Sequence, residues 1–125
     1  MHIMEYFFFS SDAIAKVNML FSLPATGSEQ DWEIELADPA RTGEFFNALE
    51  SNLALGDKDV EAAIAALLIS SADEAISSNT FPVDLDRKIK IFFRNNLELS
   101  SNMNHFFFHQ GSAPINSIIR SWLEQ

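Results

Sequence analysis

The sequence predicts a mainly α-helical fold: a bundle of about five helices around a buried central helix, with one or two short strands. Three observations support this prediction. Residues 62–69 are apolar without interruption, and a helix without a polar face belongs in the centre of a domain. Several other segments repeat apolar residues at helical spacing. The chain has 125 residues, 47% of them hydrophobic, which suits one domain spanning residues 1–125. An α+β arrangement is the alternative.

The first segments of the chain mix strand and helix signals. Residues 3–9 form a short apolar run that fits either a buried strand or the start of a helix. Asp12 can cap a helix that places Ile14 and Val17 on one side and ends before Pro24.

Residues 31–36 alternate acidic with apolar side chains. Alternation puts the two kinds on opposite faces of a strand, which we expect at a sheet edge or on an open face. The apolar face would hold Trp32, Ile34 and Leu36. The acidic face would hold Asp31, Glu33 and Glu35. The same residues can also open a helix.

The middle of the chain contains the clearest helix signals. Asp38 followed by proline begins a helix that has apolar residues at helical spacing and ends near Gly56. Asp57 or Asp59 then caps the central helix, predicted over residues 60–76.

Two further helices are predicted after the break at Pro82. The first begins at Asp84 and ends at residues 100–102; its apolar stripe consists of Leu85, Ile89, Phe92, Phe93 and Leu97. Residues 103–110 are aromatic and of uncertain type. Residues 115–123 carry the clearest amphipathic helix pattern.

Charge separates the two halves of the chain. With 8 basic and 18 acidic residues, the formal net charge is −10 at pH 7, which argues against nucleic acid as a partner. Residues 1–61 hold 3 basic and 12 acidic residues, whereas residues 84–125 hold 5 basic and 4 acidic ones. A surface of one sign speeds association with an oppositely charged partner. Helix caps and solubility also account for many of these acids.

Catalytic signatures are missing from the sequence. The chain has no cysteine, so disulfides, thiolate zinc sites and cysteine nucleophiles are excluded. It has no nucleophile elbow, phosphate-binding glycine loop or His-Glu-x-x-His motif. We therefore expect no enzymatic activity and no cofactor. The longest apolar run is far shorter than a bilayer span of roughly 20 residues, and no secretory signal precedes it, so the expected location is the cytoplasm.

Weaker patterns have simpler explanations. His105 and His109 share a helical face, but a zinc site needs a third protein ligand that the segment lacks, so we predict no metal site. The Asp-x-Asp pairs at residues 57–59 and 84–86 fit helix starts better than metal sites.

One basic cluster stands out, made up of Arg87, Lys88, Lys90 and Arg94. It is interpreted as a solvated face or as an intramolecular partner for the acidic half. Phenylalanine supplies 12 of the 15 aromatic residues, with runs at residues 7–9 and 106–108. A run of three must turn one ring away from the inward face unless two layers enclose it. Burial is favoured for the first run, and the second is left open.

In size, acidic charge and missing catalytic motifs, the chain resembles the immunity proteins of bacterial toxin systems, including contact-dependent growth inhibition. The resemblance covers no motif, so no family residue is carried over. It implies a small cytosolic domain that binds a nuclease toxin and blocks its basic active site. The rival classes are an acidic regulatory adaptor or DNA mimic, and a small ligand-binding protein or enzyme.

The acidic half supplies the candidate partner-binding residues, with Trp32 or a phenylalanine as the apolar anchor. They are Asp31, Trp32, Glu33, Glu35, Asp38, Asp57, Asp59 and Glu61. If carboxylates on one exposed face bind the partner, Glu33→Lys with Glu35→Lys should abolish binding.

Overall fold

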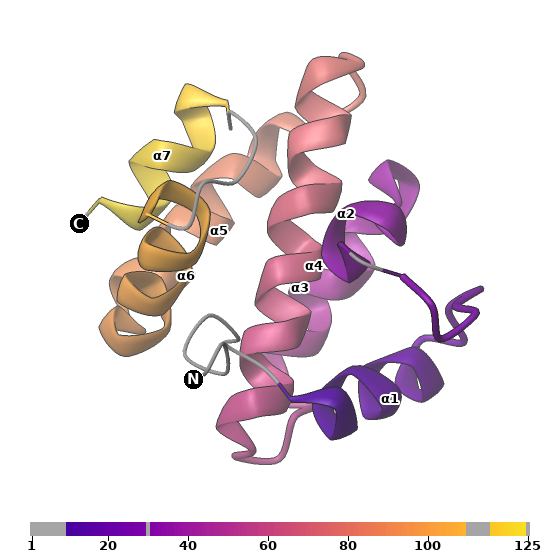
Figure 1. The fold of residues 1–125 in the computed structure, drawn as a ribbon. Helices are drawn as coiled ribbons and strands as arrows, with labels where there is room; N and C mark the ends of the chain where they lie inside the picture. The colour runs from indigo at the N-terminus through magenta and orange to yellow at the C-terminus, as the bar shows by residue number, and fades with distance from the viewer. Residues whose placement is uncertain (1–9, 30, 110–115, 125) are drawn as a thin grey trace.

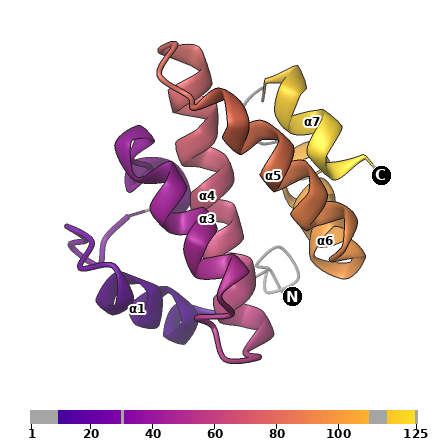
Figure 2. The ribbon, with the colours of Figure 1, turned by 180° about the vertical axis from the view of Figure 1, so that it is seen from behind.

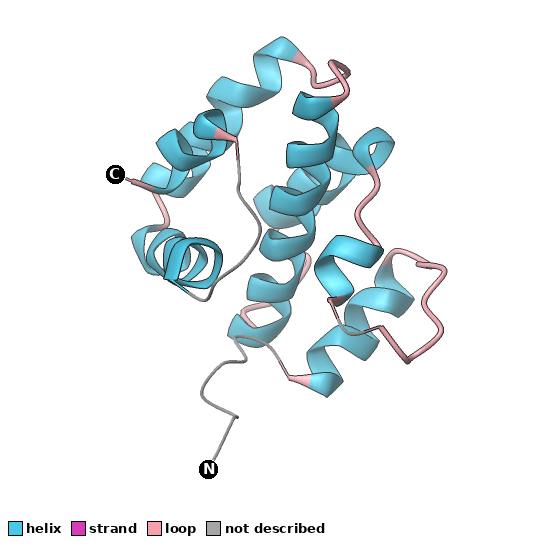
Figure 3. Cartoon of the chain, turned by 45° about the horizontal axis from the view of Figure 1, so that its top comes forward, coloured by secondary structure: helices cyan, strands magenta, loops and turns pink. Residues whose placement is uncertain are grey.

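The computed structural model describes residues 10–29, 31–109 and 116–124 of the chain. In these residues every regular element is helical and none is a strand (Figure 3). The elements are α1 (Ser11–Leu20), α2 (Trp32–Glu35), the 3₁₀ turn η2 (Pro39–Arg41), α3 (Thr42–Glu50), α4 (Lys58–Ser77), α5 (Val83–Arg94), α6 (Leu97–His109) and α7 (Ser117–Leu123). The predicted mainly α fold is confirmed, with more helices in the described residues than the five expected.

Helix α4 is the centre of the molecule, as predicted. It has 20 residues and is therefore roughly 30 Å long. Figure 1 shows α1 and α2 on one side of it and α5, α6 and α7 on the other, with α3 behind. Residues 62–69 are all buried, because α1, α2, α3 and α6 all pack against this helix. Its many alanines allow those neighbours to approach closely.

Short polar side chains fix where several helices begin. The Asp57 carboxylate accepts the backbone N–H groups of Asp59 and Val60 at 3.0 and 3.2 Å, so Asp57 is the cap of α4. Asp38 caps η2 by accepting the N–H of Ala40, as the Asp-Pro pair predicts. The cap of α1 is Ser10, whose Oγ accepts the N–H of Ala13. The sequence pointed instead to Asp12, which lies in the first turn.

Three predictions along the chain are wrong. The strand over residues 31–36 is instead the short helix α2 followed by a turn, which agrees with the alternative that these residues open a helix. The helix predicted to end near Gly56 ends at Glu50. The helix predicted to continue to residues 100–102 ends at Arg94, and α6 begins at Leu97. Asn96 separates the two helices. Its side-chain amide donates to the backbone carbonyl of Phe92 in α5, and its backbone carbonyl accepts the N–H of Ser100 in α6. Leu97, placed in the apolar stripe by the sequence, is exposed at the start of α6.

Polar contacts attach the C-terminal helix to the rest of the bundle. The buried Trp122 donates its indole N–H to Asp86 of α5 at 2.6 Å. The backbone N–H of Asn116 donates to Asp73 of α4 at 3.0 Å. Ser100, inside α6, donates its hydroxyl to the carbonyl of Leu123. Thus α7 is held by α4, α5 and α6 together.

Candidate functional site

Helix α2 exposes two acids around an apolar residue. Its inward residues are Trp32, which is 4% exposed, and Glu33, which is 7% exposed. Asp31, Ile34 and Glu35 are exposed, with Ile34 at 45%. The reason is the period: residues i, i+3 and i+4 share one face of a helix, whereas the predicted strand would have placed Ile34 beside Trp32.

Several contacts hold α2 in place. The indole N–H of Trp32 donates to Asn18 of α1 at 2.9 Å. The Glu35 carboxylate accepts the N–H of Asp31, across the helix start. Just after the helix, the N–H of Asp38 donates to the hydroxyl of Ser71, a buried residue of α4. The exposed face of α2 is therefore attached to both α1 and α4 although the helix has four residues.

The side chain of Glu33 is buried in the folded protein. Burial raises the pKa of its carboxyl, and the negative charges of Asp31 and Glu35 raise it further, while its own backbone N–H acts in the opposite direction. No ion pair with a cation offsets that burial in the described part of the chain. A partner cannot reach this side chain in the folded protein, so the expectation of an exposed Glu33 is wrong.

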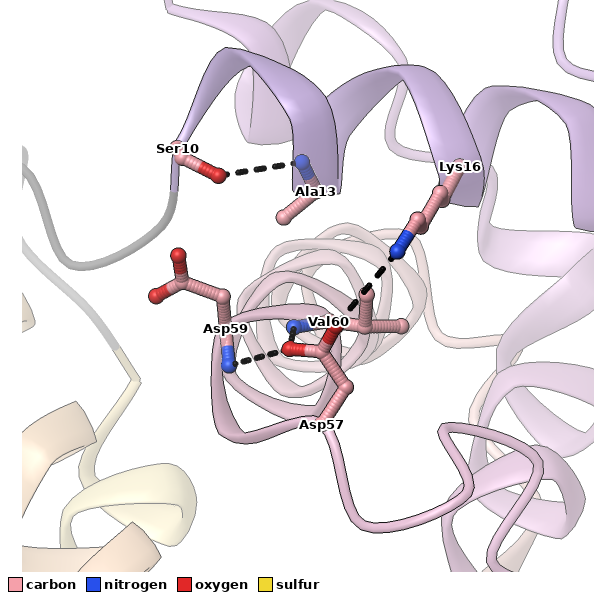
Figure 4. Close-up of polar contacts among 6 residues, drawn as sticks. All are labelled: Ser10, Ala13, Lys16, Asp57, Asp59 and Val60. Carbon is pink, nitrogen blue, oxygen red and sulfur yellow. Dashed lines mark hydrogen bonds and ion pairs between the residues drawn. The ribbon is translucent and has the colours of Figure 1, made fainter.

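The acids at the start of α4 lie elsewhere. Figure 4 shows the first turns of α1 and α4 side by side, with Lys16 of α1 reaching the Asp57 carboxylate at 3.6 Å. The N–H of Val60 is the main cause of a lowered pKa for Asp57, with smaller contributions from Asp59 and Lys16. Asp59 is exposed and Glu61 half-buried in the same first turn, where carboxylates complement the positive end of the helix.

The eight predicted residues therefore do not form one surface. Ser71, which anchors the chain after α2, lies 14 residues along α4 from Asp57, or roughly 20 Å. Capping accounts for Asp57 and for the half-buried Asp38. Of the α2 group, only Asp31 and Glu35 are exposed acids.

The basic residues of the first half are already held by acids. Arg41 pairs with Glu44 at 2.7 Å and also donates to the carbonyl of Phe21. Lys58 pairs with Glu98 at 2.8 Å, and Lys16 with Asp57. None of these three cations forms an ion pair with Asp31 or Glu35 of the α2 face.

The sequence interpretation missed the apolar component of this surface. The predicted strand places Ile34 on an apolar face with Trp32 and Leu36, but Ile34 lies between two exposed acids. Met19 and Leu20, at the end of α1, are also exposed, and the Asn18–Trp32 hydrogen bond holds that end of α1 against α2. Applying the helical period to residues 31–35 would have grouped Asp31, Ile34 and Glu35.

The other candidate groups have clear positions. Among the described residues no three His, Cys, Asp or Glu side chains are placed to hold a metal ion. His105 is exposed, and the side chain of His109 is outside the described part. In the second Asp-x-Asp pair, Asp86 accepts the hydrogen bond from Trp122 described above.

The second phenylalanine run belongs mainly to the core. Phe107 is buried, while Phe106 and Phe108 are half-buried against the same cluster. The guanidinium of Arg120, on α7, lies 4.1 Å from the centre of the Phe108 ring and covers it. The first run, residues 7–9, is outside the described residues.

The chain matches no protein-family model, and comparisons with curated proteins and with solved structures found no match either. Over the described residues, no helix combines the length and apolar character that crossing a membrane requires.

Proposed function

We propose that this chain is an acidic binding protein that neutralises a basic protein partner, in the manner of an immunity protein that blocks a nuclease toxin. The observation that supports this most is the exposed face of α2, where Asp31 and Glu35 flank the exposed Ile34. An apolar contact with a charged rim is the usual composition of a specific interface.

The chemistry of such a face suits a site built for phosphates. A nuclease active site presents Lys and Arg to the substrate backbone, and carboxylates can occupy the positions of the phosphate groups. Asp31 and Glu35 would supply the charges, and Ile34 would fill an apolar recess between the partner's cations. Because α2 is held by Trp32 and Asp38, little conformational entropy is lost on binding.

The remaining exposed acids contribute at longer range. Asp59 at the start of α4 carries no ion pair in the described structure, and it adds to the same negative field. Such a field raises the association rate and makes it depend on salt. The buried Trp32 then acts as a support for α2 in place of the predicted role as anchor.

The test uses exposed substitutions only. Because Glu33 is buried, Glu33→Lys would place a cation in the core and would report on folding. The informative variant is Asp31→Lys with Glu35→Lys. Its matched control is Glu50→Lys with Glu74→Lys, which changes the net charge equally at exposed positions near the ends of α3 and α4.

The wild-type chain and both variants are immobilised and exposed to extract from the source cell at about 50 mM salt, and the captured proteins are identified. A captured partner is then purified for binding and activity measurements. We expect one basic protein, bound by the wild type and the control but not by the α2 variant, whose nuclease activity falls on binding. Equal binding by the α2 variant would contradict the site. Capture of many unrelated basic proteins would favour an adaptor or DNA mimic.

A further inference from the structure

Helix α5 exposes a face that is the electrostatic opposite of α2. Its buried residues are Leu85, Ile89 and Phe93, spaced at i, i+4 and i+8. The opposite side carries Arg87, Ile91 and Arg94, with Lys88 alongside and the exposed Asp84 at the start of the helix. Ile91 is 43% exposed, so this face too has an apolar residue between charges.

The cations on this face have no acidic partner among the residues that the structure describes. In the described structure, Arg87, Lys88 and Arg94 form no ion pair, whereas every basic residue of α1, η2 and α4 does. Of the two interpretations of this cluster, the described residues therefore favour the solvated face for these three. Their charge is available to another molecule.

The two faces cannot meet within one chain. Figure 1 shows α2 and α5 on opposite sides of the central helix α4, and α5 comes forward when the molecule is viewed from behind in Figure 2. One chain thus presents an acid–isoleucine–acid face on one side and an arginine–isoleucine–arginine face on the other.

We propose that copies of this chain associate head to tail, with the α5 face of one copy on the α2 face of the next. This inference goes beyond the proposed function and does not depend on it. The observation behind it is the charge complementarity of two exposed faces, each with a central isoleucine. A contact between different faces does not pair two copies as a two-fold dimer does, so it builds rings or open chains of copies. Each contact covers one α2 face and keeps a basic partner away from it.

Salt affects this contact in two ways. The net charge of −10 makes two copies repel each other at long range. Physiological salt, with a screening length of about 8 Å, weakens that repulsion more than it weakens close pairs, whereas 1 M salt screens both. We therefore expect association at intermediate salt and its loss at 1 M.

The experiment exchanges the charges of the two faces. One variant carries Arg87→Glu with Arg94→Glu, and the other carries Asp31→Lys with Glu35→Lys; all substituted positions are exposed. Each variant alone presents like charges at the contact. Mixed together, they present opposite charges at both kinds of contact. Circular dichroism confirms that each variant is folded, and sedimentation velocity measures the mass over a concentration series.

Wild-type protein should show concentration-dependent association at about 150 mM salt that disappears at 1 M. Each variant alone should associate more than about 100-fold more weakly, because like charges face each other, and the mixture should recover association. The Glu50→Lys, Glu74→Lys control should behave as the wild type does.

A wild type that stays monomeric would overturn the proposal, as would a mixture that fails to recover association. A further experiment measures binding of the wild type and of the Arg87→Glu, Arg94→Glu variant to vesicles that contain phosphatidylserine. Binding to them without self-association, lost in the Arg87→Glu, Arg94→Glu variant, would assign the α5 face to a membrane and also overturn it. Because this variant leaves α2 intact, its capture of a basic partner tests the proposed function separately.

Discussion

Replacing the buried Glu33 with glutamine should stabilise the protein at neutral pH. In the folded state Glu33 is 7% exposed, and burial is the main cause that raises the pKa of its carboxyl above the ordinary value of 4.5. At neutral pH the unfolded chain ionises it at little cost, whereas the folded chain must carry a buried charge beside Asp31 and Glu35. Glutamine keeps the shape and removes the charge.

The size of the effect follows from the extra cost of burying a charged carboxylate in place of a neutral amide. A buried polar group without full compensation costs about 1–3 kcal/mol, and we take the lower end, about 1 kcal/mol, because the backbone N–H of Glu33 offsets part of the cost. In a chain of this length, such a gain raises the melting temperature by about 3–5 °C.

The pH dependence distinguishes this mechanism from simple repacking. A raised folded-state pKa leaves stability intact below the ordinary value of 4.5, and stability is lost as pH rises from there through the folded pKa. Urea unfolding of wild type and Glu33→Gln should therefore differ at pH 7 and converge at about pH 4. Glu50→Gln, at an exposed site, should have little effect at either pH. A loss of stability at pH 7, or an equal gain at both pH values, would refute the reasoning.

Three further predictions concern the core and its supports, each measured by urea unfolding at pH 7. Asp86→Ala removes the acceptor of the buried Trp122 N–H and should cost about 2 kcal/mol, while Asp86→Asn restores most of it; equal losses would contradict the hydrogen bond's role. Leu68→Ala in α4 should cost about 3 kcal/mol through a cavity, and a loss under 1 kcal/mol would place α4 away from the core. Leu55→Gly should gain about 0.5–1 kcal/mol, because Leu55 is 87% exposed with φ +54°; a clear loss would contradict strain there.

The sequence was most informative where one physical effect dominates. The apolar run of α4 has a single stable location, the centre of the bundle, and of the two predicted caps, Asp57 and Asp59, the first is the one observed. The Asp38–Pro39 start was equally clear, since both residues favour the first turn of a helix.

Prediction failed where short segments satisfy two patterns. Residues 31–36 alternate as a strand does, but the chain gains more by burying Trp32 against α1 and tying Asp38 to Ser71, and a helix allows both. No local signal reports those two distant contacts. The serines at residues 100–101 resembled a helix end, yet Ser100 donates to the carbonyl of Leu123, a partner 23 residues away.

The sequence predicted the negative charge of the candidate site but not which of its residues are exposed. The acidic half is present, but Glu33 is buried and Asp57 is engaged as a cap. Ile34 became part of the exposed face because the helical period replaced the strand period. One change of secondary structure therefore altered which residues a partner could touch.

The central claim is that the exposed face of α2 binds a basic protein. The most direct measurement is the association rate between this chain and its captured partner, from about 50 mM to 500 mM salt. We predict a rate that falls steeply with salt for the wild type and for Glu50→Lys with Glu74→Lys, and slow, nearly salt-independent association for Asp31→Lys with Glu35→Lys. Identical salt profiles for all three proteins would contradict the claim.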